Sequence, residues 1–141
     1  MPDELSRQLV TVAVPRGHGR RRVSEQVIDL SETLLTVQRE SRDDALVLRF
    51  EGQVDILSAP KMRTELDAAI TEADETLVAD LTGLTFLGSV GIAELMRVQQ
   101  QSDAGNIHFV VVAPQFIRRL LDLTGVSSTL DVRATEGDVR A

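Results

Sequence analysis

Residues 80–95, DLTGLTFLGSVGIAEL, decide how the rest of the chain is interpreted. They begin at the end of an apolar run, residues 77–81, whose composition is typical of a strand buried on both faces. A short loop is expected over residues 82–87, followed by a helix that begins at Gly88-Ser89-Val90-Gly91. Serine is a favoured helix N-cap because its hydroxyl oxygen accepts a hydrogen bond from an N–H group of the first turn. A strand that runs into a helix start therefore places the Ser89 hydroxyl at a rim of the predicted sheet.

Hydrophobic periodicity predicts an α/β domain around this stretch. Strands are expected at residues 34–39, 45–50, 76–81 and 107–112, with a short edge strand at 130–133. Helices are expected from Ser58 to the acidic residues 72–75, from Ser89 to near Gly105, and from Gln115 to Thr124. The polar turn at residues 43–44 predicts a hairpin, and the later strand–helix–strand order predicts a parallel pair with a right-handed crossover. The predicted fold is a single domain with a mixed sheet of four or five strands and helices packed against it.

This domain is expected to occupy residues 31–135. Residues 1–30 show no clear periodicity, and the sequence RGHGRRR at residues 16–22 combines glycine with like charges, which is typical of a flexible segment. We predict a flexible, solvated N-terminal tail; the alternative is an arm that contacts an acidic partner or nucleic acid. The last residues, 136–141, are expected to be frayed.

Composition restricts the classes of function. With 43% apolar and 26% charged residues, the chain has the composition of a soluble globular protein. The absence of cysteine excludes a disulfide framework, a thiolate nucleophile and a cysteine-built metal site. No metal or cofactor is expected. There is no run of about 18 apolar residues, and Asp3 and Glu4 precede only a brief apolar stretch, so neither a membrane span nor a secretion signal is expected. A cytoplasmic location agrees with these features.

The net charge of −7 is unevenly distributed. Residues 1–23 carry five arginines against Asp3 and Glu4, a net charge of +3, so the remaining residues carry −10. An acidic body disfavours nucleic acid and membrane surfaces as direct partners and favours a partner with a basic face.

Two motifs resemble those of a known family. The longer has the pattern Asp-Leu-[Ser/Thr]-x-[Leu/Val]-x-Phe-[Leu/Met]-Asp-Ser-[Ser/Thr]-Gly-[Leu/Ile], which residues 80–92 follow with two departures. The shorter, Gly-Glu-[Ile/Leu]-Asp followed by a helix, is found as Gly52-Gln53-Val54-Asp55. On these motifs the chain resembles, over roughly residues 34–133, the STAS domains of the anti-sigma factor antagonist type. The fold that this resemblance implies is the one predicted from periodicity.

The resemblance also implies a functional surface. The phosphorylated serine of the family falls on Ser89, and a helix N-terminus tolerates a phosphate because of its partial positive charge and free N–H groups. The alternative for Ser89 is a purely structural role as an N-cap. The implied partner-binding positions are Asp55, Ser58, Gly88, Ser89, Val90, Gly91 and Ile92.

The departures from the family pattern affect the phosphoacceptor. The Asp that precedes the serine in the family is Gly88 here, the following Ser or Thr is Val90, and the family's Glu is Gln53. Because an Asp beside the serine is available to orient the hydroxyl for a kinase, we predict slow or absent phosphorylation of this chain. Gly88 also permits a positive φ, so a differently shaped loop is expected. For Asp55 and Asp80 the alternative is a local turn or cap role.

The function implied is that of a non-enzymatic anti-sigma factor antagonist. It would bind an anti-sigma factor, a serine kinase in this class, and thereby release a sigma factor. Catalytic residues are not expected, because Ser89 and the two histidines lack a triad context, and neither a Gly-x-Ser-x-Gly elbow nor a Walker loop is present. One alternative is a STAS adaptor subunit of a transporter or signalling scaffold, without a phospho-switch. Another is a small-ligand sensor.

Overall fold

The computed structural model describes residues 7–15, 21–29 and 34–139. Its main element is a five-stranded sheet in the order β3-β4-β5-β6-β7. The strands are β3 (Leu35–Arg42), β4 (Ala45–Val54), β5 (Thr76–Leu87), β6 (His108–Val112) and β7 (Asp131–Arg133). β3 pairs antiparallel with β4, and the other three pairings are parallel. The predicted mixed sheet is therefore confirmed, including the short edge strand.

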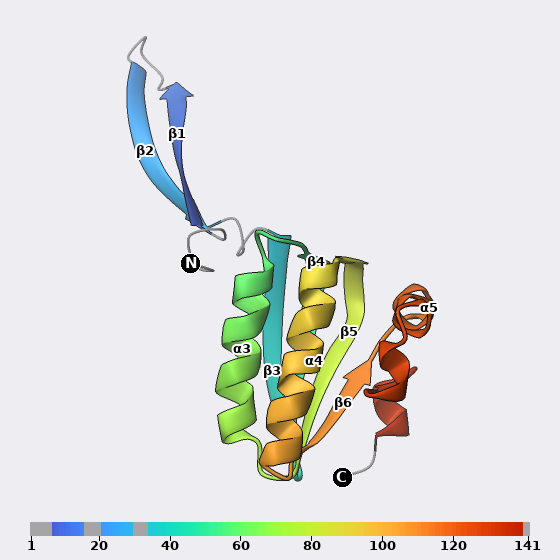
Figure 1. The fold of residues 1–141 in the computed structure, drawn as a ribbon. Helices are drawn as coiled ribbons and strands as arrows, with labels where there is room; N and C mark the ends of the chain where they lie inside the picture. The colour runs from blue at the N-terminus through green and yellow to red at the C-terminus, as the bar shows by residue number, and fades with distance from the viewer. Residues whose placement is uncertain (1–6, 16–20, 30–33, 140–141) are drawn as a thin grey trace.

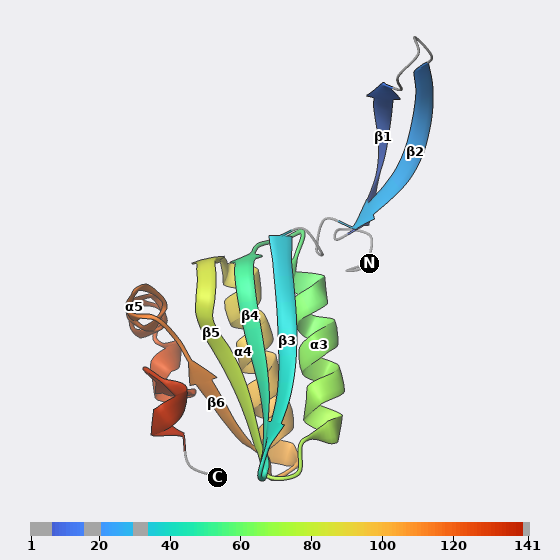
Figure 2. The ribbon, with the colours of Figure 1, turned by 180° about the vertical axis from the view of Figure 1, so that it is seen from behind.

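Three helices connect these strands. They are α3 (Ala59–Glu72), α4 (Ser89–Ala104) and α5 (Gln115–Leu123). Figures 1 and 2, seen from opposite sides, show that α3 and α4 cover one face of the sheet, and that α5 lies near β6. Alternation along β4 explains this layering: Leu46, Leu48 and Phe50 are buried in the core beneath the helices, while Val47 belongs to a cluster on the opposite face.

The end of β5 differs from the expected loop at residues 82–87. β5 continues to Leu87 and stays paired with β4, whose end lies at Val54. The pairing has two register irregularities, between Arg49 and Glu51 and between Gly52 and Gln53. Such bulges break the alternation of buried and exposed residues, so a period of two could not be recognised there. Gly52 has a φ of +114°, a conformation that side chains with a Cβ rarely adopt.

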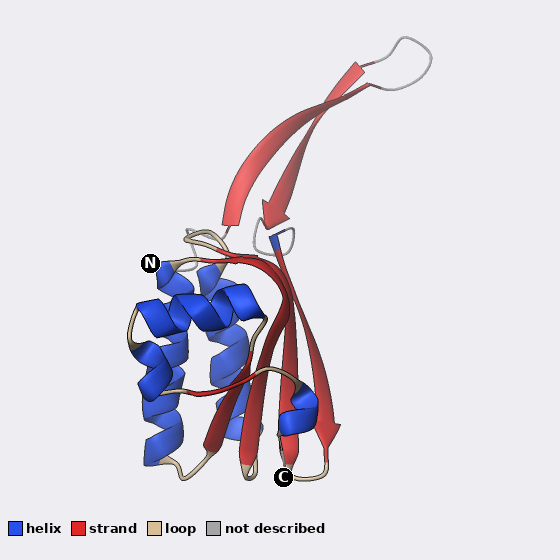
Figure 3. Ribbon diagram, turned by 90° about the vertical axis from the view of Figure 1, so that its right-hand side faces the viewer, coloured by secondary structure: helices blue, strands red, loops and turns tan. Residues whose placement is uncertain are grey.

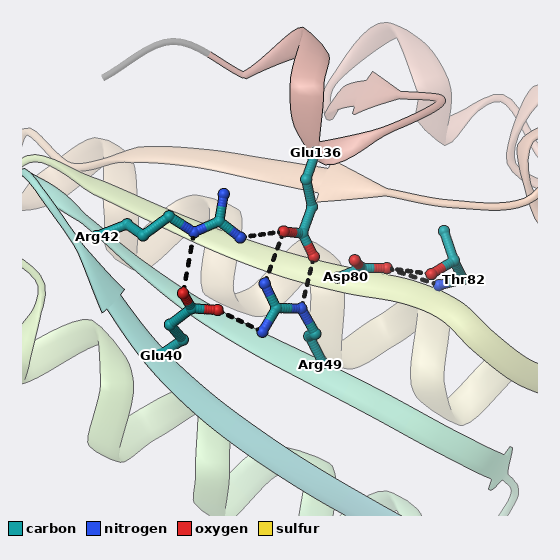
Figure 4. A network of polar contacts seen from close by, with 6 residues as sticks. All are labelled: Glu40, Arg42, Arg49, Asp80, Thr82 and Glu136. Carbon is teal, nitrogen blue, oxygen red and sulfur yellow. Dashed lines mark hydrogen bonds and ion pairs between the residues drawn. The ribbon is translucent and has the colours of Figure 1, made fainter.

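The helix-free face of the sheet is covered by the end of the chain. Val47, Val78, Val110 and Val112 form a separate apolar cluster, and Val139 packs against it. A short 3₁₀ helix, η2 (Glu136–Asp138), lies over the same face, where the Glu136 carboxylate accepts two 2.8 Å hydrogen bonds from Arg49 and also pairs with Arg42 (Figure 4). The expectation of a frayed end is therefore wrong for residues 136–139, because these contacts hold them. A second short 3₁₀ helix, η1 (Val126–Ser128), follows α5.

The N-terminal segment, predicted to be a flexible, solvated tail, contains two strands. Strands β1 (Arg7–Pro15) and β2 (Arg21–Asp29) pair antiparallel in a sheet of their own. In Figures 1 and 3 this hairpin stands apart from the five-stranded sheet. The β-branched residues of both segments favour strands, although they lack the clear alternation of a half-buried one. Residues 16–20, which hold part of the basic cluster, lie outside the described residues. Within the described ranges, no helix is long and apolar enough to cross a membrane.

Candidate functional site

The two motifs meet at one end of the sheet, where the parallel strands β4 and β5 finish. The backbone amide of Gly88 donates a 2.8 Å hydrogen bond to the carbonyl oxygen of Val54. This bond ties the start of α4 to the turn at residues 55–58, which leads into α3 (upper end of the sheet in Figure 1). The Gly-Gln-Val-Asp segment and the serine segment are therefore neighbours in space, as the predicted surface requires.

Ser89 is exposed and is the first residue of α4. The N-cap is Gly88, because its carbonyl oxygen accepts the hydrogen bonds of the Gly91 and Ile92 amides at 3.0 and 3.2 Å. The predicted N-cap role of Ser89 is thus wrong by one residue, and no side-chain cap is present at this helix start. The Ser89 hydroxyl makes no hydrogen bond to another described residue, so it is available for chemistry. The amides of Ser89 and Val90 have no backbone acceptor among the described residues, which makes this end of the helix tolerant of an added anion.

Gly88 does not use the conformational freedom of glycine. Its φ of −84° and ψ of 174° are open to any residue, so the positive φ that glycine permits is not used here. A Cβ at this position would lie 3.3 Å from Cε2 of Phe86 and 3.4 Å from the carbonyl oxygen of Val54. The half-exposed Phe86 ring can yield by a few tenths of an ångström. The backbone before Ser89 therefore accepts a side chain, including a carboxylate.

Two of the predicted partner-binding residues are buried. Ser58 is 0% exposed, and its hydroxyl accepts a 2.9 Å bond from the Asp55 amide and donates a 2.7 Å bond to the Gln53 carbonyl oxygen. Gly91 is also buried, and it packs so closely that an added Cβ would lie 2.4 Å from Leu87 Cδ1. Both residues shape the surface and cannot contact a partner directly. The Ser58 hydroxyl is already bonded within the turn at residues 53–58, and Gly91 is covered because α4 packs closely on the strand ends.

The other predicted positions remain accessible to different degrees. Asp55 is half-buried, and its Oδ1 accepts bonds from the amides of Leu57 at 2.9 Å and Ser58 at 3.1 Å. This is the turn role given above as its alternative. Val90 and Ile92 are partly buried against the core and Gly88 is half-buried, so Ser89 is the one member of the predicted set that is exposed.

Sequence reasoning missed two exposed apolar residues beside Ser89. Ile56, in the turn before α3, is 58% exposed, and Phe86, near the end of β5, is 50% exposed. The bulged pairing of β4 and β5 buries Leu84 and Leu87 and leaves Phe86 outside. The signal available in the sequence was the pair of large apolar residues Ile56-Leu57 in a short turn; Ile56 is exposed and Leu57 is only half-buried.

Asp80 has the structural role that was its alternative. It is 6% exposed, and its Oδ1 accepts hydrogen bonds from the amide and hydroxyl of Thr82 at 2.9 and 2.6 Å. It lies on the helix-free face, in the network of Figure 4. Burial raises the pKa of Asp80, and the neighbouring Glu136 carboxylate acts in the same direction. The Arg49 guanidinium lowers the pKa of Glu136 to about 2.

The structure offers no alternative chemical centre within its described ranges. No group of three His, Cys, Asp or Glu residues there is arranged to hold a metal ion. His108 pairs with Asp131 at 2.6 Å, at the beginning of β6 and hence at the opposite end of that strand from the Ser89 end of the sheet. Neither residue approaches Ser89, so the arrangement gives no nucleophile–base pair.

Comparisons with known proteins agree with this fold. The family model of the STAS domain matches residues 36–139. The chain is 27% identical over 105 residues to the anti-sigma-F factor antagonist RsfB of Mycobacterium tuberculosis, covering 74% of this chain and 85% of RsfB. It is similar to a crystal structure of an anti-sigma factor antagonist from Mycobacterium paratuberculosis, with 30% identity, a TM-score of 0.69, and coverage of 74% and 89%. Unphosphorylated SpoIIAA shares the fold, at 20% identity, a TM-score of 0.60, and coverage of 73% and 91%.

Proposed function

Because the chain belongs to the STAS domain family, we propose that it is an anti-sigma factor antagonist. It binds an anti-sigma factor through the Ser89 surface, which we define as Asp55, Ile56, Phe86, Gly88 and Ser89. The names of its mycobacterial relatives support this role, and the exposed Ser89 hydroxyl at the start of α4 is the observation that carries it. Such a protein acts by mass action: a complex with the anti-sigma factor removes that factor from its sigma factor, which then joins RNA polymerase.

Phosphorylation of Ser89 by the anti-sigma factor is the proposed means of control. A phosphate adds roughly −1.5 to −2 charges and three acceptor oxygens. The N-terminus of α4 accommodates these without a change of fold, since the amides of Ser89 and Val90 have no backbone acceptor among the described residues. In the complex the same dianion would lie within the interface and would have to lose its water, so the phosphorylated form binds weakly.

A STAS adaptor subunit without a phospho-switch is the second candidate. The observation in its favour is Gly88, which leaves Ser89 without the adjacent carboxylate of the family motif. In that case the Ser89 surface binds a transporter or scaffold component, and the charge at residue 89 does not regulate a sigma factor. Co-purification with membrane components in place of an anti-sigma factor would favour this candidate.

The deciding experiment measures binding of the full-length chain to the anti-sigma factors of its own organism, beginning with any encoded beside it. Ser89→Ala and Ser89→Asp are compared with Ser41→Asp, a control that adds the same charge at an exposed serine in β3 at the opposite end of the sheet. We expect Ser89→Ala and Ser41→Asp to bind like the parent chain and Ser89→Asp to bind at least about tenfold more weakly. Equal binding by all variants would remove the switch, and binding to no anti-sigma factor would remove the antagonist role.

A further inference from the structure

Ile56 and Phe86 are large apolar side chains left in water beside the proposed phosphoacceptor. They are 58% and 50% exposed. Phe86 pairs in register with Gln53, and Ile56 follows the end of β4 at Val54, to which Gly88 is hydrogen-bonded. Each therefore lies two residues along the chain from the Gly88–Val54 hydrogen bond that joins the two strand ends. Large apolar side chains exposed at the same end of a sheet offer a surface to a partner protein.

Both side chains stand on rigid backbone. The turn that carries Ile56 is closed by the buried Ser58 hydroxyl, with bonds of 2.7 Å to Gln53 and 2.9 Å from Asp55. The Phe86 ring lies against Gly88, with Cε2 3.3 Å and Cζ 3.7 Å from the point that a Cβ would occupy. Because the backbone that carries them is already ordered, binding costs little conformational entropy there. The two residues can therefore contribute strongly to affinity relative to the area that they bury.

The charges around the pair indicate the chemistry of the partner. Both charged side chains of residues 50–60 are acidic, Glu51 and Asp55. Glu94, the one charged side chain of residues 81–96, is paired with Arg97 at 2.8 Å. Residues 34–139 as a whole hold nine basic and seventeen acidic side chains. An apolar centre with an acidic surround is complementary to an apolar pocket rimmed by lysine or arginine.

A second copy of the chain fits this surface poorly. A two-fold contact would place the surface against itself, so Glu51 and Asp55 of one copy would face the same carboxylates of the other. Like charges brought together in an interface oppose association. The same rule favours a partner of opposite charge over self-association.

We propose that Ile56 and Phe86 are the two anchor residues of the Ser89 surface, and that they insert into an apolar, basic-rimmed pocket of the anti-sigma factor. This inference rests on the proposed function and adds the residues that supply its binding energy. Gly88 contributes to this arrangement, because the absence of a Cβ lets the Phe86 ring pack against the backbone beside Ser89.

The test uses the full-length chain and the anti-sigma factor that binds it, with affinities measured by calorimetry. Ile56→Ala and Phe86→Ala are compared with Leu123→Ala and Phe116→Ala in α5, whose side chains are 80% and 48% exposed. We expect each anchor variant to lose at least about tenfold in affinity and each control to lose less than about twofold. Thermal unfolding must show all four variants folded, and binding by the parent chain should weaken as salt is raised.

The outcomes separate this inference from the function on which it rests. If the parent chain binds an anti-sigma factor but the anchor variants bind equally well, or the α5 controls lose as much, the anchor assignment is wrong and the antagonist role stands. If the parent chain binds no anti-sigma factor, both fail. If Phe86→Ala abolishes a concentration-dependent dimer of the parent chain, the surface belongs to a second copy and the inference is overturned.

Discussion

The amide of Gly88 and the carbonyl oxygen of Val54 are joined by a 2.8 Å hydrogen bond, which fixes the start of α4 to the end of β4. Two sequence motifs that lie far apart in the chain thereby become one surface. The close fit continues at Gly91, where only hydrogen occupies the space between Leu87 and Val54. The position of the Ser89 hydroxyl thus depends on backbone contacts that particular glycines permit.

Gly91→Ala should destabilise the protein. Its Cβ would lie 2.4 Å from Leu87 Cδ1 and 2.7 Å from Val54 Cγ1, both in the packed core, so the start of α4 must shift. Overpacking of this kind costs about 1–3 kcal/mol in the free energy of unfolding. Urea unfolding provides the measurement. The control is Gly105→Ala at the end of α4, where the nearest atom would be 3.5 Å away and φ is −97°, and we expect its stability to match the parent's.

Gly88→Asp should restore the carboxylate of the family motif without loss of fold. The backbone at residue 88 is in an ordinary extended conformation, and the contact with Phe86 is with a half-exposed ring. We predict slow or absent phosphorylation of the parent chain by an anti-sigma kinase and faster phosphorylation of Gly88→Asp. Intact-mass measurement over time checks both rates. Gly88→Ala adds the Cβ alone and should stay slow. Rapid, stoichiometric modification of the parent chain at Ser89 would contradict the prediction.

Glu136→Gln should weaken the attachment of the chain end to the helix-free face. Glu136 is partly buried and its carboxylate bonds to Arg49 at two points, so its loss is expected to lower the unfolding free energy at neutral pH by about 1–2 kcal/mol. Hydrogen exchange of residues 135–139 should accelerate. Unchanged stability together with unchanged exchange would show that the ion pairs do not hold this segment.

The contribution of Glu136 should also depend on pH. The pKa of Glu136 is about 2 in the folded state, against an ordinary value of 4.5, so protons bind the unfolded chain more readily. The stabilisation is complete above the unfolded pKa and is lost as pH falls through the folded pKa. The stability difference between the parent and Glu136→Gln should therefore shrink between about pH 4.5 and about pH 2. A difference that stays constant over this range would contradict the assignment.

Asp80→Asn should raise the stability of the protein at neutral pH, whereas Glu136→Gln should lower it. Burial and the nearby Glu136 raise the pKa of Asp80, so the charged form is unfavourable in the folded state, and the penalty develops as pH rises through the folded pKa. Asparagine keeps a carbonyl oxygen for the Thr82 amide and hydroxyl but carries no charge. We expect a higher unfolding midpoint than the parent at neutral pH, and a gap that closes on acidification. A lower midpoint at neutral pH would show that the charge is needed.

Removal of residues 1–33 should leave the five-stranded domain folded. The hairpin of β1 and β2 forms a sheet of its own and lends no strand to the larger one. We expect cooperative thermal unfolding of the shortened chain and unchanged affinity for the anti-sigma factor. Loss of cooperativity would show that the N-terminal segment belongs to the domain, and loss of affinity alone would place part of the binding surface there.

The sequence by itself determined the order and type of the elements of the domain, because long apolar patterns act locally. Periodicity placed the strands and helices from β3 to β7, and the motif around Ser89 placed an exposed serine at a helix start. The tertiary structure alone decided which surface forms around that serine. Bulged pairing turned Phe86 outward and Leu87 inward, the Ser58 hydroxyl closed the turn that exposes Ile56, and Glu136 reached Arg49 from the far end of the chain. The strand pairing and the Glu136–Arg49 contact join segments distant in sequence, and the Ser58 contacts depend on the exact geometry of the turn, so the apolar pattern encodes none of them.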